Sequence, residues 1–373
     1  MKKRNSSQQG QKRAVKAKRT QESVTIGMDL GDRSSRYCML SGDGEILRED
    51  QVPTTKVGMT EAFGALGRSR IAIEVGSHSP WVSRLLGSLG HEVVVANPRQ
   101  VKLITESTRK DDRLDAQTLA RLARIDPQLL RPIRHRSEAA QTALMVIRVR
   151  AALIGVRTSL VNTVRGLAKA MGERLPKCDA DQMGVLKAES VPSKLRQLLE
   201  PLLKEVESLT EKIKDSDRKI EQIAREDYPE TALLQQVGGV GPLIALTFVL
   251  TVDDKSRFQK SRDIGCYIGL RPRRSDSGQR QPQLRITKEG DPYLRTMLVQ
   301  GAHFILSRRG PDTDLKRWGL RLAERGGKRA KKKAVIAVAR KLGILLHKLW
   351  VTGEVYEPLR NQHLRELRKK LAA

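Results

Sequence analysis

Acidic side chains stand at the ends of two apolar segments and at the start of a later amphipathic one. Asp29 closes a buried-looking segment, and Glu74 closes another. Asp112 and Asp115 are spaced so that they share one face of a helix. Four converging carboxylates would repel one another unless a cation lay among them, and Mg²⁺ prefers such hard oxygen ligands. The pattern predicts a Mg²⁺ site, with two ions able to stabilise the attacking and leaving oxygens of a phosphodiester.

A second candidate group surrounds a serine in a later segment. Ser277 precedes a glycine and has basic neighbours at Arg271, Arg273, Arg274, Arg280 and Lys288. Such cations can neutralise a phosphate and help to activate a hydroxyl as a nucleophile. Because no His–Asp relay stands nearby, a purely structural turn serine stays open as the alternative.

A glycine-rich turn at residues 238–242, Gly-Gly-Val-Gly-Pro, precedes the apolar run Leu243 to Leu250. It is similar to the turn of a helix-hairpin-helix, in which backbone N–H groups at a helix start face a phosphate. A tight turn between helices without any ligand is the alternative.

The segments around the four acids alternate between strand-like and helix-like patterns. This order predicts a mixed sheet covered by helices, which is an α/β domain. We expect strands at 24–30, 37–40, 45–47, 71–75 and 92–96, and helices at 81–89 and 112–123. Ser41-Gly42-Asp43-Gly44 has the composition of a hairpin turn between the second and third strands.

Helices dominate the rest of the chain. Residues 137–171 carry an apolar stripe, and a heptad pattern begins at Leu195, interrupted at Ser216 and containing Pro201. The heptad predicts a coiled coil that either joins protomers or pairs with 137–171 of the same chain, and both can hold together. A basic helix is expected at 326–349.

These patterns divide the sequence into five parts. We expect a disordered basic tail at 1–22, an acid-bearing catalytic domain at 23–130 and a helical connector at 137–227. A mainly helical, serine-bearing domain follows at 228–350, and a charged tail at 351–373.

The overall charge indicates a polyanionic partner. Lys and Arg total 71 against 42 acidic residues, a net charge of +29, and such a surplus repels itself unless a polyanion screens it. No run of about 18 apolar residues marks a membrane span, and the N-terminus has no apolar core of a secretory signal. Nucleic acid is therefore the expected partner.

Composition also narrows the class of protein and its compartment. Aromatic residues make up only 3 %, which argues against an RNA-recognition sheet that stacks bases. The three cysteines, Cys38, Cys178 and Cys266, form no CxxC pair, so zinc ribbons and disulfides are not expected. A cytoplasmic, nucleoid-associated protein fits this composition.

Together, the two halves resemble the DEDD transposases of bacterial insertion sequences, the insertion-sequence family one-ten, which are relatives of the Piv-type DNA invertases. The N-terminal matches are Ile26-Gly27-Met28-Asp29, Ile73-Glu74 and Lys110 to Ala116. The C-terminal matches are Gly238 to Pro242, Gly269-Leu270-x-Pro272, Ser277-Gly278 and Lys288-x-Gly290-Asp291-x-Tyr293-Leu294-Arg295. They occur in the order of the family over residues 24–310.

The resemblance implies an RNase H-like (RuvC-like) domain, a coiled-coil connector and a serine-bearing transposase domain. It implies that Asp29, Glu74, Asp112 and Asp115 hold Mg²⁺, with Asp111 as a possible shift of register. It also implies a serine that becomes covalently joined to DNA, with Ser277 as the best match and Ser275 as the fallback. The basic residues expected to hold nucleic acid are Arg271, Arg273, Arg274, Lys288 and Arg295.

The resemblance further implies donor and target DNA as partners, a dimer or tetramer, and in some members a structured bridge RNA.

Three alternative functions stay open. Asp29-Leu30-Gly31 also matches the opening of actin-like ATPases, although no second phosphate loop follows. A RuvC-type Holliday-junction nuclease would attack with water, leaving Ser277 structural, and a non-catalytic scaffold would only bind nucleic acid.

Overall fold

The structure is a computed structural model, and it describes residues 24–97, 111–185, 191, 193–282, 284–327, 329–361 and 363. The chain divides into two compact units, Met1–His135 and Arg136–Ala373, and each is considered by itself. The expected basic tail at 1–22 lies outside the described residues. The expected connector and serine-bearing domain both fall within the second unit.

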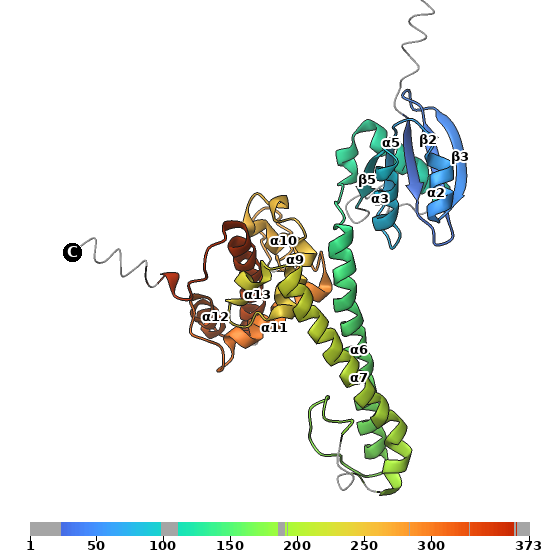
Figure 1. Cartoon of the computed structure of the whole chain (residues 1–373). Helices are drawn as coiled ribbons and strands as arrows, with labels where there is room; N and C mark the ends of the chain where they lie inside the picture. Colours follow the sequence, from blue (N-terminus) through green and yellow to red (C-terminus); the bar gives the residue numbers. More distant parts are fainter. Residues whose placement is uncertain are drawn as a thin grey trace, which may run out of the picture. The chain divides into compact units, whose positions relative to one another are not determined.

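The first unit is built on a five-stranded mixed sheet with the order β3-β2-β1-β4-β5 (Figure 1). Its strands are β1 (Thr25–Asp29), β2 (Ser34–Leu40), β3 (Ile46–Pro53), β4 (Arg70–Glu74) and β5 (Glu92–Ala96). The pairs β1–β2 and β2–β3 are antiparallel, whereas β1–β4 and β4–β5 are parallel. This mixture is the α/β arrangement that the sequence predicts.

Helices cover both faces of this sheet. Side chains alternate along a strand, so Ile26 and Met28 join one core with helices α2 (Lys56–Phe63) and α3 (Ser79–Ser88). On the opposite face, Ala72 and Cys38 lie in two smaller buried clusters with α5 (Asp112–Ile125). A short 3₁₀ helix, Pro127–Leu130, follows α5.

Gly27 sets the distance between β1 and α5. A Cβ atom at this position would lie 2.1 Å from the Ala116 carbonyl oxygen and 2.3 Å from the Ala120 nitrogen. Both of those atoms belong to the backbone, so they cannot move aside as a flexible side chain can. The helix that carries two of the acids is therefore packed directly on the strand that carries Asp29.

The second unit begins with two long helices, α6 (Glu138–Ala170) and α7 (Ser193–Glu226), which pack side by side. The heptad residues Leu195, Leu199 and Val206 are buried in one cluster with Val161 and Val164 of α6. The apolar seam of α7 is thus used inside the chain, and Pro201 lies within the helix. A further junction between protomers stays a prediction.

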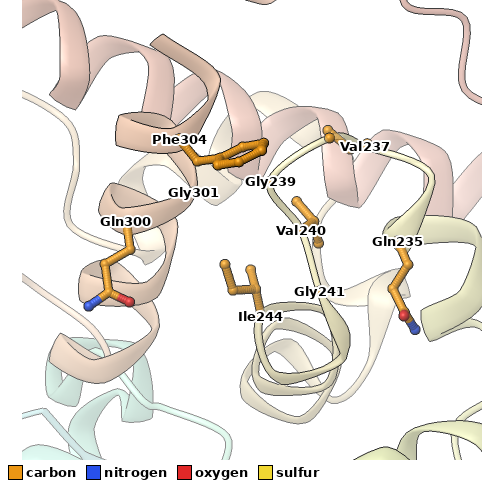
Figure 2. Close-up of a pocket in the computed structure, with 10 residues that line it drawn as sticks. Gln235, Val237, Gly239, Val240, Gly241, Ile244, Gln300, Gly301 and Phe304 are labelled. Carbon is orange, nitrogen blue, oxygen red and sulfur yellow. The ribbon is translucent and has the colours of Figure 1, made fainter. Parts of the chain in front are cut away.

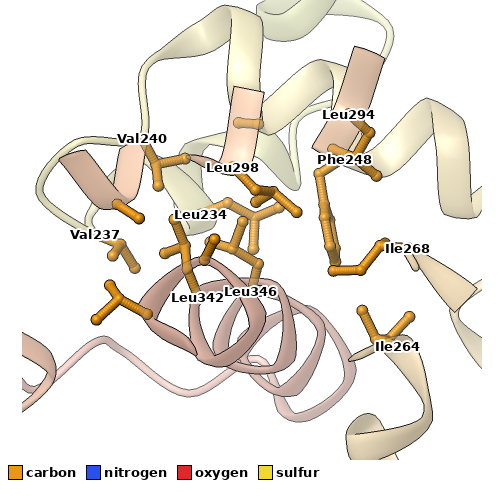
Figure 3. Packing of buried hydrophobic residues seen from close by; sticks show 14 of the residues in the cluster. Leu234, Val237, Val240, Phe248, Ile264, Ile268, Leu294, Leu298, Leu342 and Leu346 are labelled. Atoms are coloured by element: carbon orange, nitrogen blue, oxygen red, sulfur yellow. The ribbon is translucent and has the colours of Figure 1, made fainter. Parts of the chain in front are cut away.

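In the described part of the chain, the remainder of the second unit consists mainly of helices around one large apolar core (Figure 3). Phe248 of α9 lies in this core with Leu298 of α11 and Leu342 and Leu346 of α13. The helices are α8 (Thr231–Gln235), α9 (Pro242–Val252), α10 (Ile264–Tyr267), α11 (Pro292–Leu306), α12 (Asp314–Glu324) and α13 (Ala330–Thr352), with 3₁₀ turns at Lys255–Arg257 and Ser261–Asp263. No helix in the described part of the chain is both long and apolar enough to cross a membrane.

Several elements differ from the sequence-based expectation. Strand β3 extends to Pro53, and α2 follows it where no helix was expected. The segment after α13, expected as a charged tail, is partly fastened: the Asp314 N–H donates to the Pro358 carbonyl at 2.8 Å, and the Tyr356 N–H donates to the Gln236 side chain at 3.0 Å.

Candidate catalytic site

Two of the four acids lie at one edge of the sheet. Asp29 and Glu74 are the last residues of β1 and β4, which are parallel neighbours, so their carboxyl ends meet at the same edge. Asp112 and Asp115 lie in the first turn of α5, where acids also favour the helix dipole. Asp112 is exposed, whereas Asp29, Glu74 and Asp115 are half-buried.

The neighbouring acids act electrostatically on Asp29 and Glu74. Burial, then the charges of Asp112 and Asp115, raise the pKa of Asp29 to about 6. Burial, then Asp29 and Asp115, also raise the pKa of Glu74. Neither pKa shift is opposed by a cationic side chain. Three half-buried acids and the exposed Asp112 thus form a group of like charge, which is unfavourable unless protons or cations join it.

This donor set fits a divalent cation by its chemistry, because carboxylate oxygens are hard ligands and the group lacks positive charge. Its geometry is not that of a closed site. Within the described residues, no group of three or more Asp, Glu, His or Cys side chains is arranged so that it could hold a metal ion. The side chains would have to converge further on binding.

Asp111 caps a helix, unlike its neighbours Asp112 and Asp115. It is the N-cap of α5, and its side chain accepts a hydrogen bond from the Arg113 N–H at 3.0 Å. The start of α5 is also tied to the edge strand β3, because Arg113 and Gln117 both donate to the Glu49 carboxylate. These contacts hold Asp112 and Asp115 in position.

A histidine that the sequence analysis did not single out lies at the same edge of the sheet. The Trp81 indole N–H donates to His78 Nδ1 at 3.1 Å, and His78 Nε2 lies 3.4 Å from an Asp32 oxygen. His78 follows β4, and Asp32 follows β1. The only signal in the sequence was the string Gly-Ser-His-Ser-Pro-Trp directly after Glu74 and Val75.

Ser277 lies in an exposed arm formed by residues 271–289 of the second unit. The arm folds back on itself, since the Arg273 N–H donates to the Arg285 carbonyl at 2.9 Å. At its tip, Ser277 and Arg280 exchange backbone hydrogen bonds of 3.1 and 3.0 Å around Gly278. Ser275 and Ser277 are both exposed. Within the described residues, the Ser277 side chain has no hydrogen-bond partner.

Glycines hold the base of this arm together. Gly269 and Gly290 both have positive φ angles, 68° and 71°, a region that favours glycine. A Cβ atom on Gly269 would lie 2.1 Å from the Glu289 carbonyl oxygen, and one on Gly290 would lie 2.0 Å from that of Tyr267. The backbone segments at the two ends of the arm, near Gly269 and near Gly290, are therefore in direct contact.

The basic residues that were expected to contact nucleic acid divide into two groups. Arg271, Arg273 and Arg274 line a small pocket of about 260 Å³ together with Cys266 and Glu289. All three are exposed, as is Lys288, and these four are available to a phosphate.

Arg295, which was also expected to contact nucleic acid, lies differently. Its guanidinium donates to the carbonyls of Ile268 and Glu289 at 3.0 and 2.6 Å. Burial lowers its pKa. Its visible task is to hold the base of the arm.

The glycine-rich turn lines a second hollow (Figure 2). Val237 to Gly241 face Gln300 and Phe304 of α11 across a pocket of about 480 Å³. Gly241 is the N-cap of α9 and provides no side-chain cap, and Pro242 begins the helix. The turn is thus an open helix start, and the helix-hairpin-helix interpretation stays a prediction.

Asp291 joins the arm to the start of α6. Its side chain is only 5 % exposed, caps α11 through the N–H groups of Tyr293 and Leu294, and pairs with Arg136 and Arg148. Sequence reasoning placed Asp291 in a motif without assigning it a contact.

Comparison with known proteins places both halves in one family. Residues 26–171 match a transposase domain of the DEDD type found in IS110, and residues 231–316 match the transposase domain of the IS116/IS110/IS902 family. A putative transposase of Sinorhizobium fredii, y4pF/y4sB, is 31 % identical over 91 % of this chain and 87 % of its own. The chain belongs to the IS110 family of DEDD transposases.

Two further relatives of this transposase are similar over almost their full length. The transposase for insertion sequence element IS1111A of Coxiella burnetii is 28 % identical over 91 % of this chain and 93 % of its own. A probable family 20 transposase of Pseudomonas aeruginosa is 27 % identical over 89 % and 98 %. The acids of the transposase lie in the first matched region and Ser277 in the second.

Proposed function

We propose that Asp29, Glu74, Asp112 and Asp115 bind the divalent cation with which this transposase cuts DNA, Mg²⁺ in a two-ion site. The observation that carries the proposal is a group of acids without a compensating cation: burial, and then the charges of Asp112 and Asp115, raise the pKa of Asp29 to about 6. When bound, the cation would supply the positive charge that polarises a phosphate and neutralises the acids.

The residues of the chain do the positioning. Asp29 and Glu74 are fixed at the ends of paired strands, and Asp112 and Asp115 are fixed by the cap and the Glu49 contacts of α5. Arg271, Arg273, Arg274 and Lys288 would hold backbone phosphates of donor and target DNA.

Ser277 is proposed as a nucleophile in strand exchange. Its hydroxyl oxygen would bond to phosphorus while the bond from phosphorus to the leaving deoxyribose oxygen breaks. The hydroxyl proton would pass to solvent, and the leaving oxygen would take up a proton from solvent to become a free hydroxyl. The exposed arm and its exposed arginines support this role. A DEDD acid site does not by itself require a protein nucleophile, because water can attack there, so the serine step needs its own test.

The test is to trap a covalent protein–DNA adduct with the complete insertion sequence as substrate. We expect an adduct with the unaltered chain, none with Ser277→Ala, and neither cleavage nor adduct with Asp29→Asn. Ser275→Ala is the matched control on the same loop. Cleavage that persists in Ser277→Ala would instead indicate a nuclease of the RuvC type, and a scaffold would give neither product with any variant.

The proposed dimer or tetramer is supported by the outward face of α6. Met145, Val149, Val156 and Leu167 are exposed there, and their spacings of 4, 7 and 11 residues place them on one side of the helix, away from the seam with α7. The charged residues between Met145 and Leu167 each have a partner within the chain: Arg148 pairs with Asp291, Arg150 pairs with Asp217, Arg157 donates to Thr210 and Arg165 donates to the Cys178 carbonyl. A second copy of α6 is the proposed occupant of this face, because such a surface neither repels itself nor attracts phosphate.

A structured guide RNA is the remaining proposed partner. The net charge of +29 would suit an RNA as well as DNA. Sequencing the nucleic acid that copurifies with the protein tests this. Recovery of one discrete RNA encoded beside the transposase gene is the expected result, and recovery of random cellular fragments would argue against it.

A further inference from the structure

The loops that follow β1 and β4 carry a polar group beyond the four acids. His78 belongs to the loop after β4, and its Nε2 lies 3.4 Å from an oxygen of Asp32, in the loop after β1. Since these strands are parallel neighbours, both loops leave the sheet at the edge that carries Asp29 and Glu74.

The backbone around His78 is held in place before any ligand binds. The buried Ser79 hydroxyl accepts from the Gly76 N–H at 3.0 Å and lies 2.9 Å from the Gly76 carbonyl oxygen, to which it donates. The His78 and Trp81 rings meet edge to face, with centroids 6.1 Å apart. The imidazole is therefore preorganised rather than free to rotate.

Trp81 also selects the form of the imidazole ring. An indole N–H can only donate, so the His78 Nδ1 that accepts it cannot carry a hydrogen. The single hydrogen of the neutral ring then lies on Nε2, which points to Asp32. Asp32 is 93 % exposed, so its contact with His78 can be exchanged for another oxygen at little cost.

We propose that His78 is a further substrate-binding residue of the transposase. Its Nε2–H donates a hydrogen bond to a nonbridging oxygen of the phosphate held at the acid site, and Trp81 acts as a positioning residue. In the protein without DNA, the Asp32 oxygen occupies the place of the phosphate oxygen. A neutral donor suits this position, because a cationic side chain would be repelled by the cations that the acids bind.

This inference rests on the proposed acid site, and the experiment separates the two. Excision of the complete insertion sequence in cells is measured by counting element junctions, with the amount of protein and its melting temperature measured for each variant. Asp29→Asn is expected to abolish excision. Loss of one preorganised donor costs about 100-fold in comparable sites, so His78→Ala should reduce excision by roughly that factor.

Two companion variants distinguish a phosphate contact from a surface ion pair. His78→Gln keeps an N–H near the position of Nε2 and should restore most of the activity. Asp32→Asn should leave excision unchanged or raise it, since Asp32 only competes for the same hydrogen. If the pair merely stabilised the loop, His78→Ala and Asp32→Asn would have the same small effect, and the proposal would be overturned.

The role of Trp81 is tested through the ring itself. Trp81→Phe removes the N–H and keeps an aromatic ring, so the nitrogen-15 signals of His78 should move from the Nε2–H form toward a mixture. Excision should fall by roughly 10-fold, because about 1.4 kcal/mol of positioning is lost. In the His78→Gln background the same change should have no further effect, since glutamine has no tautomers.

The outcomes separate cleanly. Asp29→Asn that excises normally would remove the proposed acid site and this inference together. If Asp29→Asn is inactive but His78→Ala excises the element within threefold of the rate of the unaltered chain, only the inference about His78 is wrong. An additive loss in Trp81→Phe/His78→Gln would show that Trp81 acts through packing and not through the tautomer of His78.

Discussion

At the scale of single residues, Asp29 links pH, cations and stability. Burial and the neighbouring acids raise its pKa from 3.8 to about 6, so the native chain holds a proton over a range in which the unfolded chain has lost it. A raised carboxyl pKa therefore removes stability as the pH rises through this range. The raised pKa of Glu74 acts in the same direction.

We predict that the Asp29 carboxyl contributes a loss of stability to the metal-free chain between about pH 4 and pH 6, and that Asp29→Asn removes this contribution. Thermal unfolding in a chelator measures it: the variant should match the unaltered chain near pH 4 and exceed it at pH 7. Saturating Mg²⁺ should reverse the order at pH 7, because the cation binds only the intact acid set. A variant less stable at pH 7 without metal would contradict the acid group described here.

Asp291 gives a second prediction at this scale. Replacing it with alanine removes a helix cap and leaves two arginines without their acid, and we expect a cost of about 2 kcal/mol in unfolding free energy. Asp291→Asn keeps a capping oxygen and should cost about half as much. Denaturant titration of both variants checks the difference. Equal costs would show that the capping oxygen contributes little, and an Asp291→Asn variant as stable as the unaltered chain would show that the ion pairs contribute little.

At the scale of elements, the contact at Gly27 ties α5 to β1. Gly27→Ala would push α5 off the strand and move Asp112 and Asp115 away from Asp29, although it alters none of them. Overpacking of this kind costs about 1–3 kcal/mol of unfolding free energy. The variant should stay folded, but its rate of DNA cleavage should fall because the acids are displaced.

Gly87 provides the matched control for this substitution. It lies in α3 with open space around its Cβ position, so Gly87→Ala should be neutral or stabilise by up to about 1 kcal/mol. Melting curves and cleavage rates for both alanine variants check the prediction. Normal cleavage by Gly27→Ala would mean that the strand–helix spacing does not govern the acids.

The sequence predicted the buried strands better than the exposed elements. Strands β1, β4 and β5 carry short apolar runs, and they were expected within about two residues of their ends. Strand β3 is a mostly exposed edge strand, Ile-Leu-Arg-Glu-Asp-Gln-Val-Pro, which lacks the alternation that marks a half-buried strand. Helix α2 is short and contains a glycine, so its pattern is equally weak.

The strength of the local sequence pattern also explains which residues of the site could be predicted. Acids at strand ends are visible in a sequence because the strand itself marks them, as at Asp29 and Glu74. The contacts of His78 join residues 46 positions apart, and those of Asp291 reach back 143 positions to Arg148, so no local pattern could have indicated them.

At the scale of the whole molecule, self-association should depend on the outward face of α6. Replacing Val149 and Val156 together with glutamate would place two acidic charges within its apolar row. Burying a valine contributes about 1.5–3 kcal/mol, so association should weaken at least roughly 100-fold. Light scattering after size-exclusion chromatography measures the change.

Val355→Glu is the control for this prediction, since Val355 is exposed and lies after α13. It should leave the oligomer unchanged. A Val149→Glu/Val156→Glu protein that keeps its molar mass at every concentration would exclude a second copy of α6 as the occupant of this face.

The first residues of the second unit are already fastened within it. Arg136 donates to the Thr251 carbonyl at 3.1 Å, and Ser137 donates twice to Asp253, at 2.9 and 2.7 Å. The peptide bond between His135 and Arg136 is therefore a place where the polypeptide can be interrupted without unravelling the helical half. Two separate genes, one for each portion, should yield two folded products from which a working transposase could be reassembled.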